Sequence, residues 1–220
     1  MAGDRIRAQR LAVASERLLD PGALEWARCR PHAVPLAPAP VVLVQAVSPY
    51  VAASTGHGRV GRLEASAAHD GAMLSLRLVW ADPTRDDRIT DLDRFTDAAA
   101  VMFPLAPGAT PFSMGAPGKP VNAWLWRAEA AEPFDVIAEG YATSRRRPAS
   151  TSGLTATARH ESGSWTLVFQ RPLATEQAGC IRFQPGSPSE IAFAIWDGSG
   201  RDRSAQKAFS AGLFTLDVEV

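Results

Sequence analysis

The chain has 220 residues, and its 23 basic and 23 acidic side chains give a formal net charge of zero. A neutral protein has no long-range field that would attract phosphate backbones or anionic lipids, so nucleic acids and membrane surfaces are poor candidate partners. Hydrophobic residues make up 46% and charged residues 21% of the chain, as in ordinary globular proteins. We expect no signal peptide, because charged residues interrupt the N-terminal stretch, and no membrane span, which needs about 20 apolar residues.

Residues 1–40 predict an N-terminal arm. The stretch to about Leu19 is polar and could be helical, and a proline-rich segment follows it. The prolines favour an extended backbone and do not fit a central strand. We expect the arm to pack on the domain or on a partner, and not to form a disordered tail, because it carries large apolar side chains. These are Leu18, Leu19, Leu24 and Trp26.

Residues 41–220 predict an all-β fold, an antiparallel β-sandwich with a few short helices. The expected strands are residues 41–47, 61–65, 73–80, 121–127, 154–160, 165–170, 190–196 and 213–220. Leu74, Leu76 and Leu78 show the period of two that a strand with one buried face requires. We expect short helices only at residues 91–100 and 204–208. Many short strands between turns, without long alternating helices, favour a sandwich.

No sequence motif of a known catalytic site is present, so the chain offers little support for an autonomous enzyme. The four histidines match no metal or catalytic-triad pattern, and we expect loop or surface positions for them. The two cysteines, Cys29 and Cys180, match neither a metal site nor a CxxCH haem-attachment site. Their pairing cannot be read from the sequence, and free thiols are the expectation.

Lysine is unusually rare. Of the 23 basic residues only two, Lys119 and Lys207, are lysines, and the other 21 are arginines. A lysine amine can lose its proton and donate a lone pair, which arginine cannot do. Chance survival of two lysines explains either one alone, but Lys207, in a polar segment before the final strand, is the stronger candidate for a special role.

Met114 lies in a loop rich in glycine and proline, Pro-Phe-Ser-Met-Gly-Ala-Pro-Gly at residues 111–118. Met73 and Met102 stand in strand-like or apolar segments and are expected to fill the core. A thioether beside Gly115, which permits close backbone approach, could instead point into a cofactor cavity.

Trp124 and Trp126 share one face of an expected strand. Three interpretations remain open for them: sandwich core, the wall of a pocket for a planar cofactor, or a platform on which sugar rings stack.

Several segments carry a family resemblance. Residues 97–104 read Asp-Ala-Ala-Ala-Val-Met-Phe-Pro, residues 112–115 Phe-Ser-Met-Gly, and residues 120–126 Pro-Val-Asn-Ala-Trp-Leu-Trp. Residues 191–198 and 206–210 read Ile-Ala-Phe-Ala-Ile-Trp-Asp-Gly and Gln-Lys-Ala-Phe-Ser. With Val-Ser-Pro-Tyr at 47–50 and Gly-His-Gly at 56–58, the chain from about residue 40 resembles the haem b-binding γ subunits of the type II dimethyl sulfoxide reductase family. It is most similar to those of the ethylbenzene dehydrogenase type or, as the alternative, the steroid C25 dehydrogenase type.

The resemblance implies a haem site. In that family a β-sandwich holds one non-covalent haem b through a methionine and a lysine, and these positions fall on Met114 and Lys207. Phe112, Trp124 and Trp126 stand in the same matching stretch, and we count them among the expected cofactor-binding residues.

The resemblance also implies partners and a place in the cell. The family's γ subunit is a non-catalytic electron-transfer subunit of a heterotrimer with a molybdenum catalytic α subunit and an iron–sulfur β subunit. In a molybdenum dehydrogenase of the hydrocarbon-hydroxylating type, as the resemblance implies here, it receives electrons from the iron–sulfur subunit and passes them to an external acceptor such as a cytochrome c. Export to the periplasm together with folded partners is expected, with the cytoplasm as the alternative.

A carbohydrate-binding β-sandwich module is the alternative function. Its support is a set of tryptophans on expected strands, because flat aromatic faces stack on sugar rings. These are Trp124, Trp126, Trp165 and Trp196. A structural interaction subunit without a cofactor is a third possibility.

Overall fold

The computed structural model describes residues 5–40, 42 and 56–220. The expected strand at 41–47 and the matching segment at 47–50 therefore lie outside the described residues, apart from Val42. The described strands are β1 (Arg5–Arg10), β2 (His32–Pro35), β3 (Ala37–Pro38), β4 (Arg62–His69), β5 (Met73–Ala81), β6 (Ala98–Pro104), β7 (Val121–Arg127), β8 (Phe134–Ala138), β9 (Arg145–Pro148), β10 (Thr155–Glu161), β11 (Ser164–Pro172), β12 (Ser189–Trp196), β13 (Ala208–Phe209) and β14 (Phe214–Val218). The described helical elements are α1 (Ser15–Leu19) and two short 3-10 turns, Leu24–Arg28 and Ala149–Thr151.

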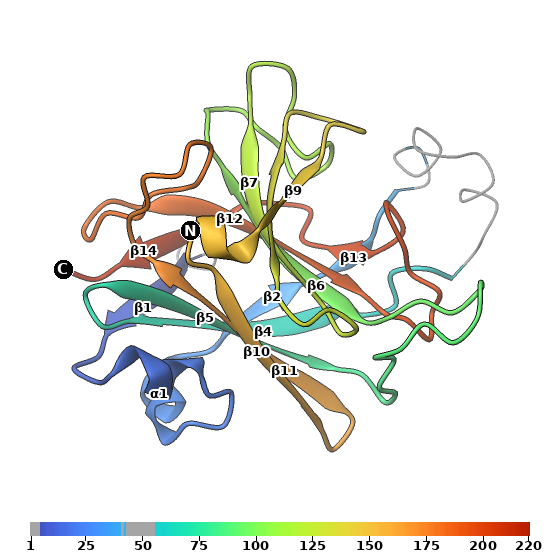
Figure 1. The fold of residues 1–220 in the computed structure, drawn as a ribbon, viewed down its shortest axis with the longest axis horizontal. Helices are drawn as coiled ribbons and strands as arrows, with labels where there is room; N and C mark the ends of the chain where they lie inside the picture. The colour runs from blue at the N-terminus through green and yellow to red at the C-terminus, as the bar shows by residue number, and fades with distance from the viewer. Residues whose placement is uncertain (1–4, 41, 43–55) are drawn as a thin grey trace.

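Strand β12 connects two layers of strands. Its residues 189–191 pair with β14, and its residues 192–196 pair with β6. One layer has the order β10-β11-β5-β4-β1-β14, and the other continues from β12 through β6-β7-β8-β9. In Figure 1, β7 rises across the direction of β4 and β5, which belong to the other layer.

The main hydrophobic core lies between the two layers. Trp126 of β7 contacts Trp80 of β5 with ring centroids 6.3 Å apart, and Trp124 of β7 contacts Phe169 of β11 at 6.1 Å. Residues from both layers belong to one buried cluster. This arrangement confirms the predicted all-β sandwich.

The first strand corrects one sequence prediction. Residues 5–10 do not form a helix but strand β1, which lies between β14 and β4 and runs parallel to both. Ile6 and Ala8 are 2% and 0% exposed, whereas Arg5 and Arg7 point to solvent, so the segment has the period of a strand. The described part of the N-terminal arm packs on the domain, where Leu18 and Trp26 join a small buried cluster.

The two short helices predicted at residues 91–100 and 204–208 are wrong. Residues 91–97 are irregular, and Ala98 begins β6, because Ala99, Val101 and Phe103 alternate into the core. Residues 204–207 form a turn that leads into β13.

Both cysteines are free, as expected. Among the described residues, no helix has the length and apolar character needed to cross a membrane.

Candidate cofactor site

A cavity of about 690 Å³ opens beside strands β6, β7 and β8. Loops around Met114, Tyr141 and Lys207 complete its walls. Small residues on the strands, namely Ala98, Ala100 and Ala123, leave this volume free. The size is that of pockets that take a drug-sized or cofactor-sized ligand, typically about 300–1,000 Å³.

The alternation of side chains along β7 separates the cavity from the core. Ala123, Leu125 and Arg127 line the cavity. Trp124 and Trp126, on the opposite face, are 0% and 8% exposed and belong to the main core. The structure therefore places neither predicted tryptophan in the cavity, and both stabilise the contact between the two layers.

The backbone at Met114 is held by two loops. Met114 and Gly115 have φ angles of 55° and 84°, so the chain turns sharply here in the left-handed region. A Cβ at Gly115 would lie 2.4 Å from the carbonyl oxygen of Lys119, so only glycine fits. The Gly140 amide donates to the Met114 carbonyl at 2.9 Å. These contacts present the Met114 side chain to the cavity.

Lys207 reaches the same cavity from the segment before β13. Its carbonyl accepts a hydrogen bond from the Ala39 amide at 2.9 Å, which fixes the backbone. Its Nζ lies 5.2 Å from the ring centroid of Trp196, which also lines the cavity. The structure thus brings together the two residues that composition and resemblance selected.

Burial makes the amine of Lys207 easier to deprotonate than an exposed lysine amine. Among the described residues no carboxylate forms an ion pair with it, although Asp202 lines the same cavity. The Asp202 carboxylate accepts hydrogen bonds from the Gly58 and Asp197 amides instead. Burial lowers the pKa of Lys207 to about 8. A neutral amine, unlike an ammonium group, has a lone pair to donate.

Phe112 also lines the cavity, as predicted from its matching stretch, and remains 40% exposed. Its ring contacts that of Phe209 edge-on at 5.3 Å, and its carbonyl accepts a hydrogen bond from the Tyr141 hydroxyl at 3.1 Å. This part of the wall is aromatic.

Sequence reasoning did not find the cationic part of the wall. Arg127, Arg146 and Arg203 line the cavity. Arg127 pairs with Glu129 at 2.6 Å. Arg146 and Arg203 stack on aromatic rings, 5.0 Å from Phe134 and 4.8 Å from Phe95. Nothing in the sequence distinguishes these arginines from the other 18 of the chain's 21.

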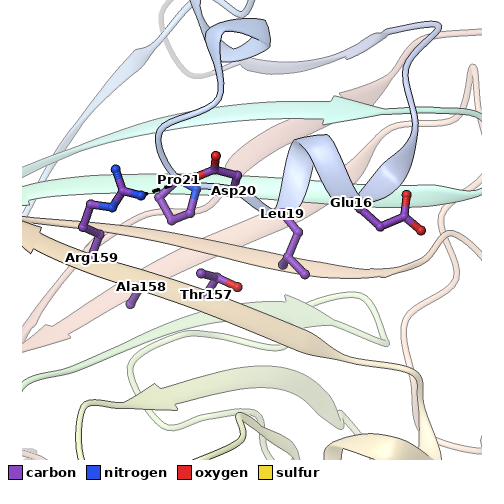
Figure 2. Close-up of a pocket in the computed structure, with 7 residues that line it drawn as sticks. All are labelled: Glu16, Leu19, Asp20, Pro21, Thr157, Ala158 and Arg159. Atoms are coloured by element: carbon purple, nitrogen blue, oxygen red, sulfur yellow. Dashed lines mark ion pairs between the residues drawn. The ribbon is translucent and has the colours of Figure 1, made fainter.

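Figure 2 shows a second hollow, between α1 and strand β10. Its one ion pair joins Arg159 to Asp20 at 3.8 Å, with both side chains about half exposed. It contains no methionine or lysine and none of the predicted site residues.

Comparison with known proteins identifies the family of the chain. The profile of the family described as "Ethylbenzene dehydrogenase" matches residues 24–153 and 146–208. Chlorate reductase subunit gamma of Ideonella dechloratans is 31% identical over 208 residues, which cover 94% of this chain and 82% of that protein. A protein of Haloferax mediterranei with the provisional name of a respiratory nitrate reductase haem subunit is 31% identical over 199 residues, 90% of this chain and 68% of that protein.

Similarity to solved structures concerns the fold alone. A family 9 carbohydrate binding module from Caldicellulosiruptor kristjanssonii, solved in complex with glucose, superposes with a TM-score of 0.51 over 98% of this chain and 95% of that chain. The sequence identity is 9%. The profile match over most of the chain, with the relatives at 31% identity, shows that this chain belongs to the ethylbenzene dehydrogenase family, the haem-binding γ subunits of the type II dimethyl sulfoxide reductase class.

Proposed function

We propose that this electron-transfer subunit binds one haem b in the cavity, with Met114 and Lys207 as the axial ligands of the iron. The observation that carries the proposal is that one cavity of about 690 Å³ is lined by both residues, which come from distant parts of the chain.

The donor set fits haem iron. Met114 offers a thioether, which serves as an axial ligand in cytochromes. Lys207 offers an amine whose pKa burial lowers to about 8, so the cost of deprotonation before ligation is reduced. The apolar strand residues and the ring of Phe112 suit the faces and edge of a large planar group.

Arg146 and Arg203 are the proposed partners of the haem propionates. Both line the cavity, and neither forms an ion pair with a carboxylate of the described residues. Their guanidinium groups can bind carboxylates through two parallel hydrogen bonds. Arg127 is a weaker candidate because Glu129 already neutralises it.

A bound haem supplies a carrier for one electron at a time. As a ligand, Met114 would raise the reduction potential of that carrier, because thioether ligation favours the reduced iron. The apolar wall formed by Ala98, Ala100 and Leu125 limits water access and has the same effect.

The proposal extends to the assembly. As relatives named γ subunits belong to multi-subunit reductases and dehydrogenases, we place this chain in a heterotrimer with a molybdenum α subunit and an iron–sulfur β subunit. It would accept electrons from the iron–sulfur subunit and deliver them to an external acceptor such as a cytochrome c. The proposed compartment is the periplasm, reached together with the partner subunits.

A carbohydrate-binding function lacks a sugar platform. Trp124, Trp126 and Trp165 are 0%, 8% and 3% exposed and cannot stack on a sugar ring. Trp196 is half-buried beside Lys207.

The visible spectrum of the purified chain tests the proposal. We expect a Soret band and α/β bands on reduction. Acidified acetone should extract the pigment, because the sequence has no CxxCH for covalent attachment. Colourless protein, or pigment that stays on the polypeptide, would contradict the proposal.

A further inference from the structure

Three buried carboxylates meet next to the haem cavity without lining it. Asp82 follows β5, Asp97 precedes β6 and Asp197 follows β12. One carboxylate oxygen of each lies within 4.8 Å of the other two. The three residues are only 2%, 0% and 9% exposed.

The three charges have no cationic partner in the described part of the chain. None of the ion pairs formed there involves Asp82, Asp97 or Asp197. Like charges this close in a buried place repel strongly, so they require either a proton or a cation.

One oxygen of the cluster has no hydrogen-bond donor. Asp82 Oδ1 accepts from the amide and hydroxyl of Thr84 at 3.1 and 3.2 Å. Asp82 Oδ2 is buried and receives no hydrogen bond. A buried oxygen without a partner costs free energy, which a ligand bound there would recover.

The other two carboxylates are held firmly in position. Asp97 Oδ2 accepts from Trp165 Nε1 at 2.9 Å, and Asp97 Oδ1 accepts from the Gly198 amide at 2.9 Å. Asp197 Oδ1 accepts from the Ser199 hydroxyl at 2.7 Å. Carboxylates that bind metal ions in proteins are commonly oriented by hydrogen bonds of this kind.

We propose that Asp82, Asp97 and Asp197 bind a Ca²⁺ ion. The set contains only hard oxygen donors, which excludes metals that prefer nitrogen or sulfur. Ca²⁺ accepts several protein oxygens in irregular geometry, whereas Mg²⁺ keeps several of its waters, and the three carboxylates are at most 9% exposed to water.

A Ca²⁺ ion bound by these carboxylates would connect chain segments that also form walls of the proposed haem cavity. Asp97 directly precedes Ala98, which lines the cavity, and Asp197 begins the turn that leads to Lys207. The two segments are already in close contact, because a Cβ at Gly198 would lie 2.3 Å from the carbonyl oxygen of Phe95. Ca²⁺ therefore stabilises the backbone that presents Lys207.

Calorimetry and thermal unfolding of the purified full-length chain, after dialysis against a chelator, test the site. We expect one Ca²⁺ per chain. Ca²⁺ at about 100 times its Kd should raise the Tm by roughly 5–10 °C, because a ligand of the folded state stabilises by mass action. A shift as large with Mg²⁺ would overturn the choice of Ca²⁺.

Matched variants locate the site. Asp82→Asn keeps the shape and removes one charge, so the chain should fold but bind Ca²⁺ at least about tenfold more weakly, as expected when a charged ligand is lost. Glu190→Gln, an exposed position on β12, should leave the shift unchanged. If the unaltered chain takes up no Ca²⁺, the proposal is wrong, and a higher Tm of Asp82→Asn in chelator would then show that the cluster holds a proton. Retention of the full shift by Asp82→Asn, or its loss in Glu190→Gln, would also overturn it.

Discussion

Met114 is the only residue of the loop at 111–118 whose side chain has a thioether. Met114→Ala leaves the backbone as it is, because Ala keeps the Cβ at the φ of 55°. We expect the variant to lose the thioether ligand, and any haem that remains should have a lower reduction potential, measured by redox titration. Met102→Leu is the control. Met102 is buried in a hydrophobic cluster against which Met114 packs, but it does not line the cavity. An unchanged potential in Met114→Ala would show that the thioether is no ligand.

Lys207 makes the stability of the haem-free chain depend on pH. Burial lowers its pKa from 10.5 to about 8, so between these values the unfolded chain holds the proton more often than the folded chain. Below pH 8 the buried ammonium group therefore lowers the unfolding free energy by a constant amount. This destabilisation decreases as the pH rises from 8 toward 10.5. Relative to Lys207→Met, the unaltered chain should become more stable across this range in urea unfolding. A difference that stays constant with pH would contradict a depressed pKa.

The sequence singled out Met114 and Lys207, both of which line the cavity, because each is unusual in this chain. Lys207 is one of only two lysines, and Met114 lies in a loop rich in glycine and proline. The cationic wall was not, because Arg146 and Arg203 are chemically identical to many surface arginines and only the fold brings them to the cavity. The carboxylate cluster was equally hidden, since Asp82 and Asp97 lie at the two ends of the segment between β5 and β6, whereas Asp197 follows β12, far along the chain.

Strand β6 shows how one element serves both the core and the cavity. Ala99 faces the core and is 0% exposed, whereas the next residue, Ala100, lines the cavity. We expect Ala100→Phe to fill the cavity and lower the haem content. The unfolding free energy of the haem-free protein should change by no more than about 0.5 kcal/mol.

The matched variant is Ala99→Phe. A large ring on the core side has no free volume, so overpacking should lower the unfolding free energy by about 1–3 kcal/mol in urea denaturation. If both variants lose haem equally and are equally unstable, the division of β6 into a core face and a cavity face is mistaken.

The elements that were predicted well are those with clear period-two patterns, such as β5, β7 and β14. The predicted short helix at residues 91–100 included the first three residues of β6, 98–100. Alanine has the highest helix propensity, but pairing with β7 and β12 overrides that preference. For β7 the pattern showed that Trp124 and Trp126 share a face. It could not show which face meets the other layer, since both faces of β7 are largely buried.

The proposed heterotrimer is a prediction at the scale of the whole molecule. Its net charge is zero, which favours association. Large apolar side chains remain exposed, among them Leu24 at 83% and Leu92 at 98%. Gel filtration of native extract should therefore place the chain in a heterotrimer well above its own mass of 23.5 kDa. A stable monomer as the sole native species would rule out an obligate complex.

The absorption spectrum of Lys207→Arg, compared with that of Lys119→Arg, tests the proposed ligation most directly. Arginine keeps the charge and much of the length, but its guanidinium stays protonated and has no lone pair to offer iron. Lys207→Arg should therefore lose the six-coordinate low-spin spectrum and show a high-spin haem or poor haem retention. Lys119→Arg should keep the spectrum, because Lys119 is exposed and does not line the cavity. An intact low-spin spectrum in Lys207→Arg, above all if Lys119→Arg disrupts it, would show that Lys207 does not bind the iron.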